Sequence, residues 1–344
     1  MAYCYYTCNL LPLDLLVRAG HSPRWLGEFV RGRTPTARRD ALSVHPLTCP
    51  YVTKLLPAAE EVLRGHGGAD GSRGEPPGAP DPAQGTDCLV VPGGCDAMRR
   101  LGDLLAATYP NRVHVVHIPR ASSATAVARL SADLRALEQT LTDRVGSPDT
   151  RSQDEATDPS PSLDYTEPPR PGGVFVVSGP LSDDSLLQLI LRLGSHISGL
   201  ESCTSPDRWK PLAPAAAEAL SGAPSTDTTP RSAPDYEALA ELVLTAGMCP
   251  RRSTIDRRAH LERRFDESEP TSIIYARQSF CDPGAYDALL VAELARERGL
   301  PFLEIEVDFP FDANGPLRTR VEAFLEAQLL DDDLLDVDEL FEEV

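Results

Sequence analysis

Apolar residues along this chain follow two alternating patterns. Short apolar runs, typical of buried strands, occupy about residues 87–92, 113–118, 173–179, 272–277 and 302–307, and a shorter run lies near the start. Segments with apolar residues at every third or fourth position follow these runs, which is typical of amphipathic helices. Because strands and helices that alternate along a chain form parallel sheets with right-handed crossovers, we expect a doubly wound α/β fold.

The predicted helices differ in how clearly the pattern defines them. The clearest covers about residues 123–145, where leucines recur at helical spacing. Another begins after Ser182, whose side chain is expected to cap the first turn. Cys49 is expected at the entry of a further helix. The remaining predicted helices occupy about residues 13–19, 96–108, 235–247, 255–265, 284–298 and 316–329.

Polar segments rich in proline, glycine or serine interrupt these elements and suggest domain boundaries. At 344 residues the chain exceeds the usual size of a single core, so two α/β lobes are expected. The predicted N-terminal lobe covers 1–146 and contains a flexible insertion at about 65–86. A linker over 147–172 leads to the predicted C-terminal lobe over 173–330, which contains a Pro/Ser/Thr-rich break at about 211–234. An acidic tail over 331–344 follows.

The charge of the chain limits the partners it can have. A formal net charge of −19 argues against nucleic acid and against anionic membranes, because both need a basic surface. The start of the sequence has no charged n-region and no apolar stretch long enough to span a membrane. We therefore expect a cytoplasmic location, where disulfides are rare and cysteines are free thiols or metal ligands.

The eight cysteines are scattered, at positions 4, 8, 49, 88, 95, 203, 249 and 281, and no CxxC occurs. This scatter excludes a zinc finger or a ferredoxin-type run of ligands. It leaves room for a cluster whose ligands come from distant loops.

Three cysteines stand where an extended segment passes into a helix. Cys95 and Cys281 each end a predicted strand and are followed by Asp, and Cys49 precedes the helical pattern of LTCPYVTKLL. In parallel α/β folds ligands bind at the carboxyl ends of the strands, and a helix N-terminus favours the thiolate that binds metals. These positions predict a metal centre between the two lobes. The alternative is that the three thiols are small buried apolar groups.

The other cysteines and the remaining polar motifs are less specific. Cys88 lies within a strand and is expected in the core, as is Cys4; Cys8 either faces the same cleft as the three ligand candidates or packs in the core. Cys203 and Cys249 each precede a turn with an arginine, so both are candidates for lining a pocket. Gly93-Gly94 matches neither GxGxxG nor a Walker A motif, so a nucleotide site is not supported.

Histidines and arginines add two further expectations. His114 and His117 flank a strand and are interpreted as structural. Arg318 and Arg320 lie at the start of a predicted helix, whereas basic residues are favoured near helix C-termini. They could clamp an acidic group or form surface ion pairs. No catalytic residue can be assigned from the sequence.

Taken in order, the motifs of the chain resemble those of the 2-hydroxyacyl-CoA dehydratase D-component family, which also includes benzoyl-CoA reductase subunits and double-cubane-cluster proteins. The resemblance runs from near the first residue to about Leu329. It is carried by YTCNLLPLDLLVRAGHSP, LTCPYVTKL, DCLVVPGGCDAMRRLGDLL, VSGPL, ESCTSPDRW, MCPRR, SFCDPGAYDALL, RGLPFLEIEVDFP and LRTRVEAFLE.

The resemblance implies two Rossmann-like lobes with a 4Fe–4S cluster in the cleft between them, held by Cys49, Cys95 and Cys281. It implies an oxygen-sensitive lyase that removes water from a 2-hydroxyacyl-CoA through a ketyl radical, after one-electron reduction. The implied partners are an ATP-dependent iron–sulfur activator and a paralogous subunit or a second copy of the chain.

The resemblance leaves several alternatives open. One is an ATP-coupled reductase of the benzoyl-CoA reductase or double-cubane type, in which Cys8, Cys203 or Cys249 would supply additional ligands. Another is a non-catalytic partner or scaffold subunit. The acyl group, the stoichiometry and the presence of a flavin are not specified by any motif.

Overall fold

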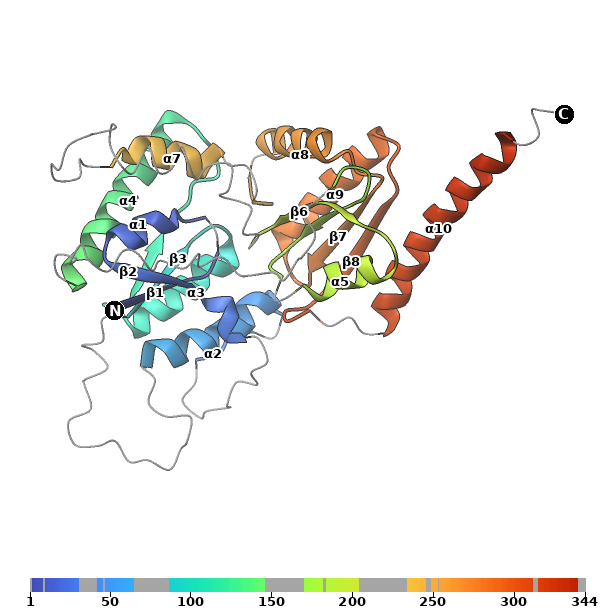
Figure 1. Cartoon of the computed structure of the whole chain (residues 1–344). Coiled ribbons are helices and arrows are strands. Elements are labelled where there is room, and N and C mark those ends of the chain that lie inside the picture. Colours follow the sequence, from blue (N-terminus) through green and yellow to red (C-terminus); the bar gives the residue numbers. More distant parts are fainter. Residues whose placement is uncertain are drawn as a thin grey trace, which may run out of the picture. The chain divides into compact units, whose positions relative to one another are not determined.

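A computed structural model shows two compact units (Figure 1). Unit 1 contains Met1–Ser162 and Cys203–Arg257, and unit 2 contains Leu163–Ser202 and Arg258–Val344. Each unit is described by itself. The structure describes residues 2–8, 10–30, 42–45, 47–64, 87–145, 170–181, 184–203, 234–245, 249–252, 254–311 and 315–339.

Unit 1 is built on a four-stranded parallel sheet in the order β2-β1-β3-β4. Its strands are β1 (Ala2–Tyr6), β2 (His21–Trp25), β3 (Cys88–Pro92) and β4 (Val113–Val116). Every residue of β3 is buried, as expected for a central strand of a parallel sheet that is covered on both faces.

The helices of unit 1 are α1 (Leu13–Arg18), the 3-10 helix η1 (Leu26–Val30), α2 (Pro50–Arg64), α3 (Asp96–Thr108), α4 (Ala124–Val145) and α7 (Tyr236–Thr245). Helix α7 packs against α4 (Figure 1), and the Tyr236 hydroxyl donates a 2.7 Å hydrogen bond to the Glu138 carboxylate. Residues 203–257 therefore group with unit 1, whereas the sequence analysis placed them inside the C-terminal lobe.

Unit 2 repeats the same topology, with a parallel sheet in the order β6-β5-β7-β8. Its strands are β5 (Val174–Ser178), β6 (Ile197–Ser202), β7 (Ser272–Gln278) and β8 (Phe302–Val307). Its helices are α5 (Ser185–Arg192), α9 (Asp282–Glu297), α10 (Gly315–Glu339) and most of α8 (Thr254–Ser268).

Both faces of the unit 2 sheet are covered by apolar packing. On one face, leucines of α5 and α10 pack against β5, β7 and β8; on the other, α8 and α9 enclose Phe175 and Tyr275. Phe175 and Phe265 meet edge to face, with ring centroids 5.0 Å apart. Helices on both faces of a parallel sheet define a doubly wound architecture, so the predicted α/β fold with two Rossmann-like lobes is confirmed.

Strands β2 and β6 were not predicted, and several boundaries differ. Helix α5 begins at Ser185 after Asp184, so Ser182, the expected cap, is not adjacent to the helix and lies outside the described residues. The expected insertion at 65–86 and nearly all of the expected break at 211–234 and linker at 147–172 also lie outside them.

Helix α10 continues well beyond its predicted end. It runs to Glu339 and so includes much of the segment interpreted as an acidic tail. Despite this length, neither α10 nor any other helix in the described ranges is apolar enough to cross a membrane.

Candidate functional site

The third strand in each sheet order leads into a helix through a cysteine. Cys95 occupies the N-cap position of α3 after β3, and Cys281 occupies that of α9 after β7. Both have extended backbone, neither makes a side-chain cap hydrogen bond, and both are half-buried. The predicted strand-to-helix placement of these two cysteines is confirmed, and it leaves each thiol at the helix end where negative charge is favoured.

The turn that carries Cys281 is shaped by its neighbours. A Cβ atom on Gly284 would lie 3.2 Å from the Cys281 Sγ atom, so the glycine leaves room for the sulfur. Phe280 adopts a left-handed conformation with φ of 54°, which is uncommon for a residue other than glycine. The corresponding position in unit 1, three residues after Cys95, is the buried Met98.

Cys49 directly precedes α2, as predicted. Burial raises the pKa of its thiol, although the backbone N–H groups of Tyr51 and Val52 hydrogen-bond to it and act in the opposite direction. The helix N-terminus was expected to favour the thiolate, but at this position burial outweighs it. A bound cation nearby would favour the deprotonated form of Cys49.

Tyr51 fixes the start of α2 against the loop after β1. Its hydroxyl donates to the Thr7 carbonyl and accepts a 3.0 Å hydrogen bond from the Trp25 indole Nε1. Burial raises the pKa of Tyr51 well above its usual value, and the nearby thiols of Cys8 and Cys203 act in the same direction. Two of the three cysteines named as possible additional ligands thus lie near the start of the helix that follows Cys49.

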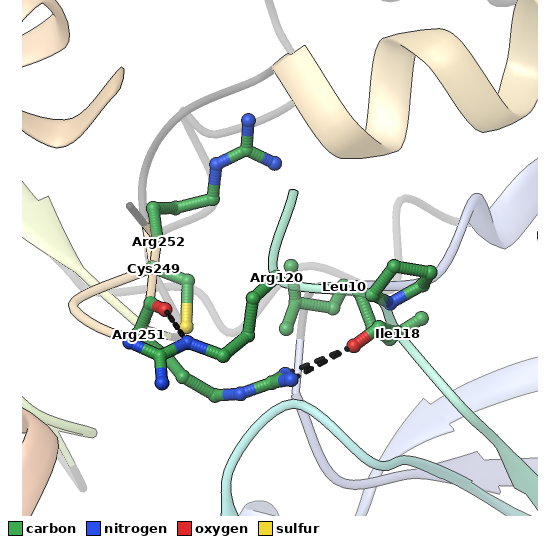
Figure 2. Close-up of a pocket in the computed structure, with 7 residues that line it drawn as sticks. Leu10, Ile118, Arg120, Cys249, Arg251 and Arg252 are labelled. Atoms are coloured by element: carbon green, nitrogen blue, oxygen red, sulfur yellow. Dashed lines mark hydrogen bonds between the residues drawn. The ribbon is translucent and has the colours of Figure 1, made fainter. Parts of the chain in front are cut away.

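Arg251 joins the 249–252 segment to the edge of the unit 1 sheet. Its guanidinium donates two 3.0 Å hydrogen bonds to the Ile118 carbonyl and a 3.4 Å hydrogen bond to the Gly93 carbonyl. Arg120 Nε in turn donates to the Arg251 carbonyl at 3.3 Å, and Figure 2 shows these side chains around the Cys249 thiol. The carbonyls of Gly93 and Ile118 follow β3 and β4, so this segment covers their carboxyl ends.

This anchoring brings two of the candidate cysteines to one edge. Burial lowers the pKa of Arg251, whereas the thiols of Cys249 and Cys95 both act to raise it. Their influence indicates that both lie near this guanidinium. The sequence analysis noted an arginine after Cys249 but did not recognise it as the residue that positions the segment.

Of the six candidate ligands, Cys281 belongs to unit 2, and Cys8, Cys49, Cys95, Cys203 and Cys249 belong to unit 1. Within the described part of the chain, no three metal-ligating side chains gather closely enough to form a ready metal site. What fits a thiolate-bound metal is the donor set itself, because Cys49, Cys95 and Cys281 are half-buried thiols at helix N-termini. Their assignment as ligands stays a prediction.

Cys4 and Cys88 are fully buried, which confirms their expected place in the core. They are register partners on β1 and β3, and a hydrogen bond from Cys4 lowers the pKa of Cys88 to about 6, with a further contribution from His21. Burial also lowers the pKa of the nearby His114 to about 4. These groups lie toward the amino ends of the strands, away from the edge that carries the candidate ligands.

The two arginines at the start of α10 make surface contacts. Arg318 forms a 2.6 Å ion pair with Glu322, and Arg320 donates a 2.9 Å hydrogen bond to the Glu304 carbonyl. Both side chains are exposed. For Arg318 this supports the surface ion pair over the clamp on an acidic group.

Residues 176–327 match the family described as 2-hydroxyglutaryl-CoA dehydratase, D-component. The match confirms the family resemblance inferred from the motifs over this part of the chain. It covers part of β5, all of β6, β7 and β8, and Cys281. It indicates a dehydratase component. No curated protein matches the chain.

Proposed function

We propose that this chain is the iron–sulfur subunit of a 2-hydroxyacyl-CoA dehydratase, a hydro-lyase. The observation that carries the proposal is the repeated cysteine at the N-cap after the third strand of each sheet, Cys95 in unit 1 and Cys281 in unit 2. The D-component match over residues 176–327 supports the same reaction class.

In this proposal Cys49, Cys95 and Cys281 would hold a 4Fe–4S cluster. Such a cluster, when bound by three cysteines, supplies a low-potential electron and an iron with an open position. The contribution of the chain is local: the helix N-termini favour the negative charge of the thiolates, and Gly284 leaves space for the Cys281 sulfur. At Cys49, hydrogen bonds from Tyr51 and Val52 oppose the effect of burial.

The family is described as one component of a dehydratase, which supports the proposal that this chain acts with other proteins. We propose an ATP-dependent iron–sulfur activator as the electron donor, and a paralogous subunit or a second copy of the chain to complete the enzyme. The acidic segment at 331–344 is a proposed docking element for one of them. Loss of association on deletion of this segment, measured by analytical ultracentrifugation, would support that role, and unchanged association would contradict it.

A second candidate is an ATP-coupled reductase with a double-cubane cluster. It is favoured by one observation, that Cys8, Cys203 and Cys249 lie in the same unit as Cys49 and Cys95. The thiols near Tyr51 and near Arg251 would then supply additional ligands.

Anaerobic purification followed by iron and sulfide determination and EPR spectroscopy tests the proposal. We expect about four irons per chain for a single cubane and about eight for a double cubane. The single variants Cys49→Ser, Cys95→Ser and Cys281→Ser should each lose most of this iron, because one of three protein ligands is removed. Cys88→Ser is the matched control, since its thiol is fully buried within the sheet.

Activity then separates dehydration from reduction. With activator, ATP and a 2-hydroxyacyl-CoA, we expect formation of the corresponding enoyl-CoA by the wild-type chain and none by the three ligand variants. Normal iron content in all three variants would contradict the ligand assignment. Absence of iron from the wild-type chain after reconstitution would instead indicate a non-catalytic partner subunit.

A further inference from the structure

Three arginines gather at the carboxyl edge of the unit 1 sheet. Arg99 comes from the first turns of α3, Arg120 follows β4, and Arg251 belongs to the segment that covers both strand ends. Arg120 Nε donates a 3.3 Å hydrogen bond to the Arg251 carbonyl, and the Arg251 guanidinium donates to the Gly93 carbonyl at 3.4 Å. Arg99 Nε lies 3.9 Å from the position that a Cβ atom on Gly93 would occupy. Arg99 and Arg120 therefore both lie close to Arg251.

No carboxylate of the described residues forms an ion pair with any of these three arginines. Their neighbour Arg252 is paired with Asp256 at 3.4 Å, and arginines elsewhere are similarly paired, such as Arg277 with Glu304. Three arginines without a carboxylate partner among the described residues are unexpected in a chain with a net charge of −19. Such a group is what an anion-binding site requires.

The hydrogen-bonding capacity of the group is only partly used inside the protein. Arg251 is committed to the carbonyls after β3 and β4. Arg120 uses its Nε atom to contact the Arg251 carbonyl, and among the described residues its terminal amino groups make no hydrogen bond. Arg99 Nε is buried and has no hydrogen-bond partner in the described structure. A buried donor without a partner is costly, so a ligand that accepts from it would be stabilised.

Two of the arginines, Arg120 and Arg251, border a shallow hollow that is partly open to solvent. Arg252 and Cys249 also line it, together with the apolar Leu10 and Ile118 (Figure 2). Gly93 lies beside Arg99, because a Cβ atom there would be 3.9 Å from Arg99 Nε and 3.7 Å from His117 Nδ1. The group thus lies where ligands bind in doubly wound folds, outside the carboxyl ends of the strands.

We propose that Arg99, Arg120 and Arg251 form a binding site for phosphate groups, occupied in the enzyme proposed above by the phosphates of coenzyme A. A guanidinium binds phosphate oxygens in a bidentate manner, and three guanidiniums match an anion that carries several negative charges. A single carboxylate would neutralise only one of them. The identity of the occupant rests on the proposed function, whereas the phosphate chemistry rests on the arginines.

Isothermal titration calorimetry of the full chain tests this site without requiring catalysis. The ligands are coenzyme A, inorganic pyrophosphate and pantetheine, which lacks the phosphates. We expect coenzyme A and pyrophosphate to bind and pantetheine to bind at least tenfold more weakly. Affinity for the two phosphate ligands should fall as ionic strength rises, because added salt screens the cations.

The arginine variants are Arg120→Gln, Arg99→Gln and the double variant. Each removed guanidinium should raise the Kd for coenzyme A and for pyrophosphate about tenfold, because a charge-assisted hydrogen bond is worth roughly that factor in affinity. Arg100→Gln is the matched control: it lies on the same helix with the same charge change, but it pairs with Asp103 at 3.4 Å on an exposed face. Arg120 is exposed, so its variant tests the site even if Arg99→Gln fails to fold.

The outcomes separate the site from the proposed function. Unchanged coenzyme A affinity in both Arg120→Gln and the double variant would overturn the site while leaving the dehydratase proposal intact. Arginine-dependent binding of pyrophosphate without binding of coenzyme A would support the phosphate site and contradict the acyl-CoA function. Failure of both phosphate ligands to bind the wild-type chain would overturn the site.

Discussion

Unit 1 and unit 2 share a strand order but differ in the groups at their sheet edges. In both, the third strand of the order leads through a half-buried cysteine into a helix. The edge of unit 1 also carries further thiols and arginines that pair with no carboxylate of the described residues. The corresponding region of unit 2 carries internally paired charges, with Arg277 bonded to Glu304 at 2.7 Å and to Glu306 at 2.5 Å. The same strand order can thus carry either arginines that are available to a ligand or arginines that are already ion-paired within the protein.

This difference suggests separate roles for the two units. A paired charge is already neutralised and needs no ligand, whereas the arginines of unit 1 gain from an incoming anion. We infer that unit 2 contributes mainly the Cys281 turn, and that unit 1 contributes two of the proposed ligands together with the proposed phosphate site. The predictions that follow test this division.

The largest effect is expected at the Cys281 turn. Gly284→Val would place a branched side chain against the Cys281 Sγ atom, which a single Cβ would already approach to 3.2 Å. We expect the variant to lose more than half of the bound iron, measured after anaerobic reconstitution. The rate at which a thiol reagent labels Cys281 in the iron-free chain should also differ between Gly284→Val and the wild type. Ala285→Val, on the exposed side of the same turn, is the control. Unchanged iron in Gly284→Val would indicate that Cys281 is not a ligand.

A smaller effect is expected from His114 in unit 1. Its pKa is lowered from 6.5 to about 4 by burial, with smaller contributions from Arg144 and His21, so the unfolded chain binds the proton first as the pH falls. The stabilisation is complete above pH 6.5 and is lost progressively between 6.5 and about 4. The loss should reach about 3 kcal/mol in the free energy of unfolding.

Chemical denaturation at pH 7 and pH 5 measures this loss, with His114→Phe as the variant. The difference between the two pH values should be smaller in His114→Phe than in the wild type, because the variant has no group to protonate. An equal pH dependence in both proteins would show that other groups govern the acid sensitivity of unit 1.

The smallest effect is expected at the exposed charges of unit 2. Arg277 lowers the pKa of Glu306, and Ser279 adds a 3.0 Å hydrogen bond. This contribution is present above the usual pKa of 4.5 and is lost as the pH falls through the lowered value. Because Glu306 is largely exposed, Glu306→Gln should cost at most about 1 kcal/mol at pH 7. A loss of several kcal/mol would contradict the view that this edge is a solvated surface network.

The sequence predicted the central strands well and missed two of the edge strands. β3, β5 and β7 are continuous apolar runs because central strands of a parallel sheet are buried on both faces. The missed strands, β2 and β6, are edge strands in equivalent positions. The first contains Pro23 and the second contains Gly199, and both residue types are typical of strand ends and edges rather than central strands.

The site was predictable only where its chemistry is local. Cys95 and Cys281 could be placed at strand-to-helix turns because the strand before each cysteine and the helix after it are both visible in the adjacent sequence. The arginine group could not, since Arg99, Arg120 and Arg251 come from three separate segments and meet only through tertiary packing. Their signals in the sequence were the position of Arg120 just after a predicted strand and the arginine turn after Cys249, and neither connects the three residues.

The path of the chain between the units has a consequence for dissecting the molecule. Because residues 203–257 return to unit 1, a gene cut at the expected linker would yield an N-terminal fragment without α7 and without Arg251. Neither half produced by such a cut would be an intact folding unit. The stretch that matches the family, 176–327, is itself shared between both units. A fragment cut at the bounds of this match would therefore contain parts of both.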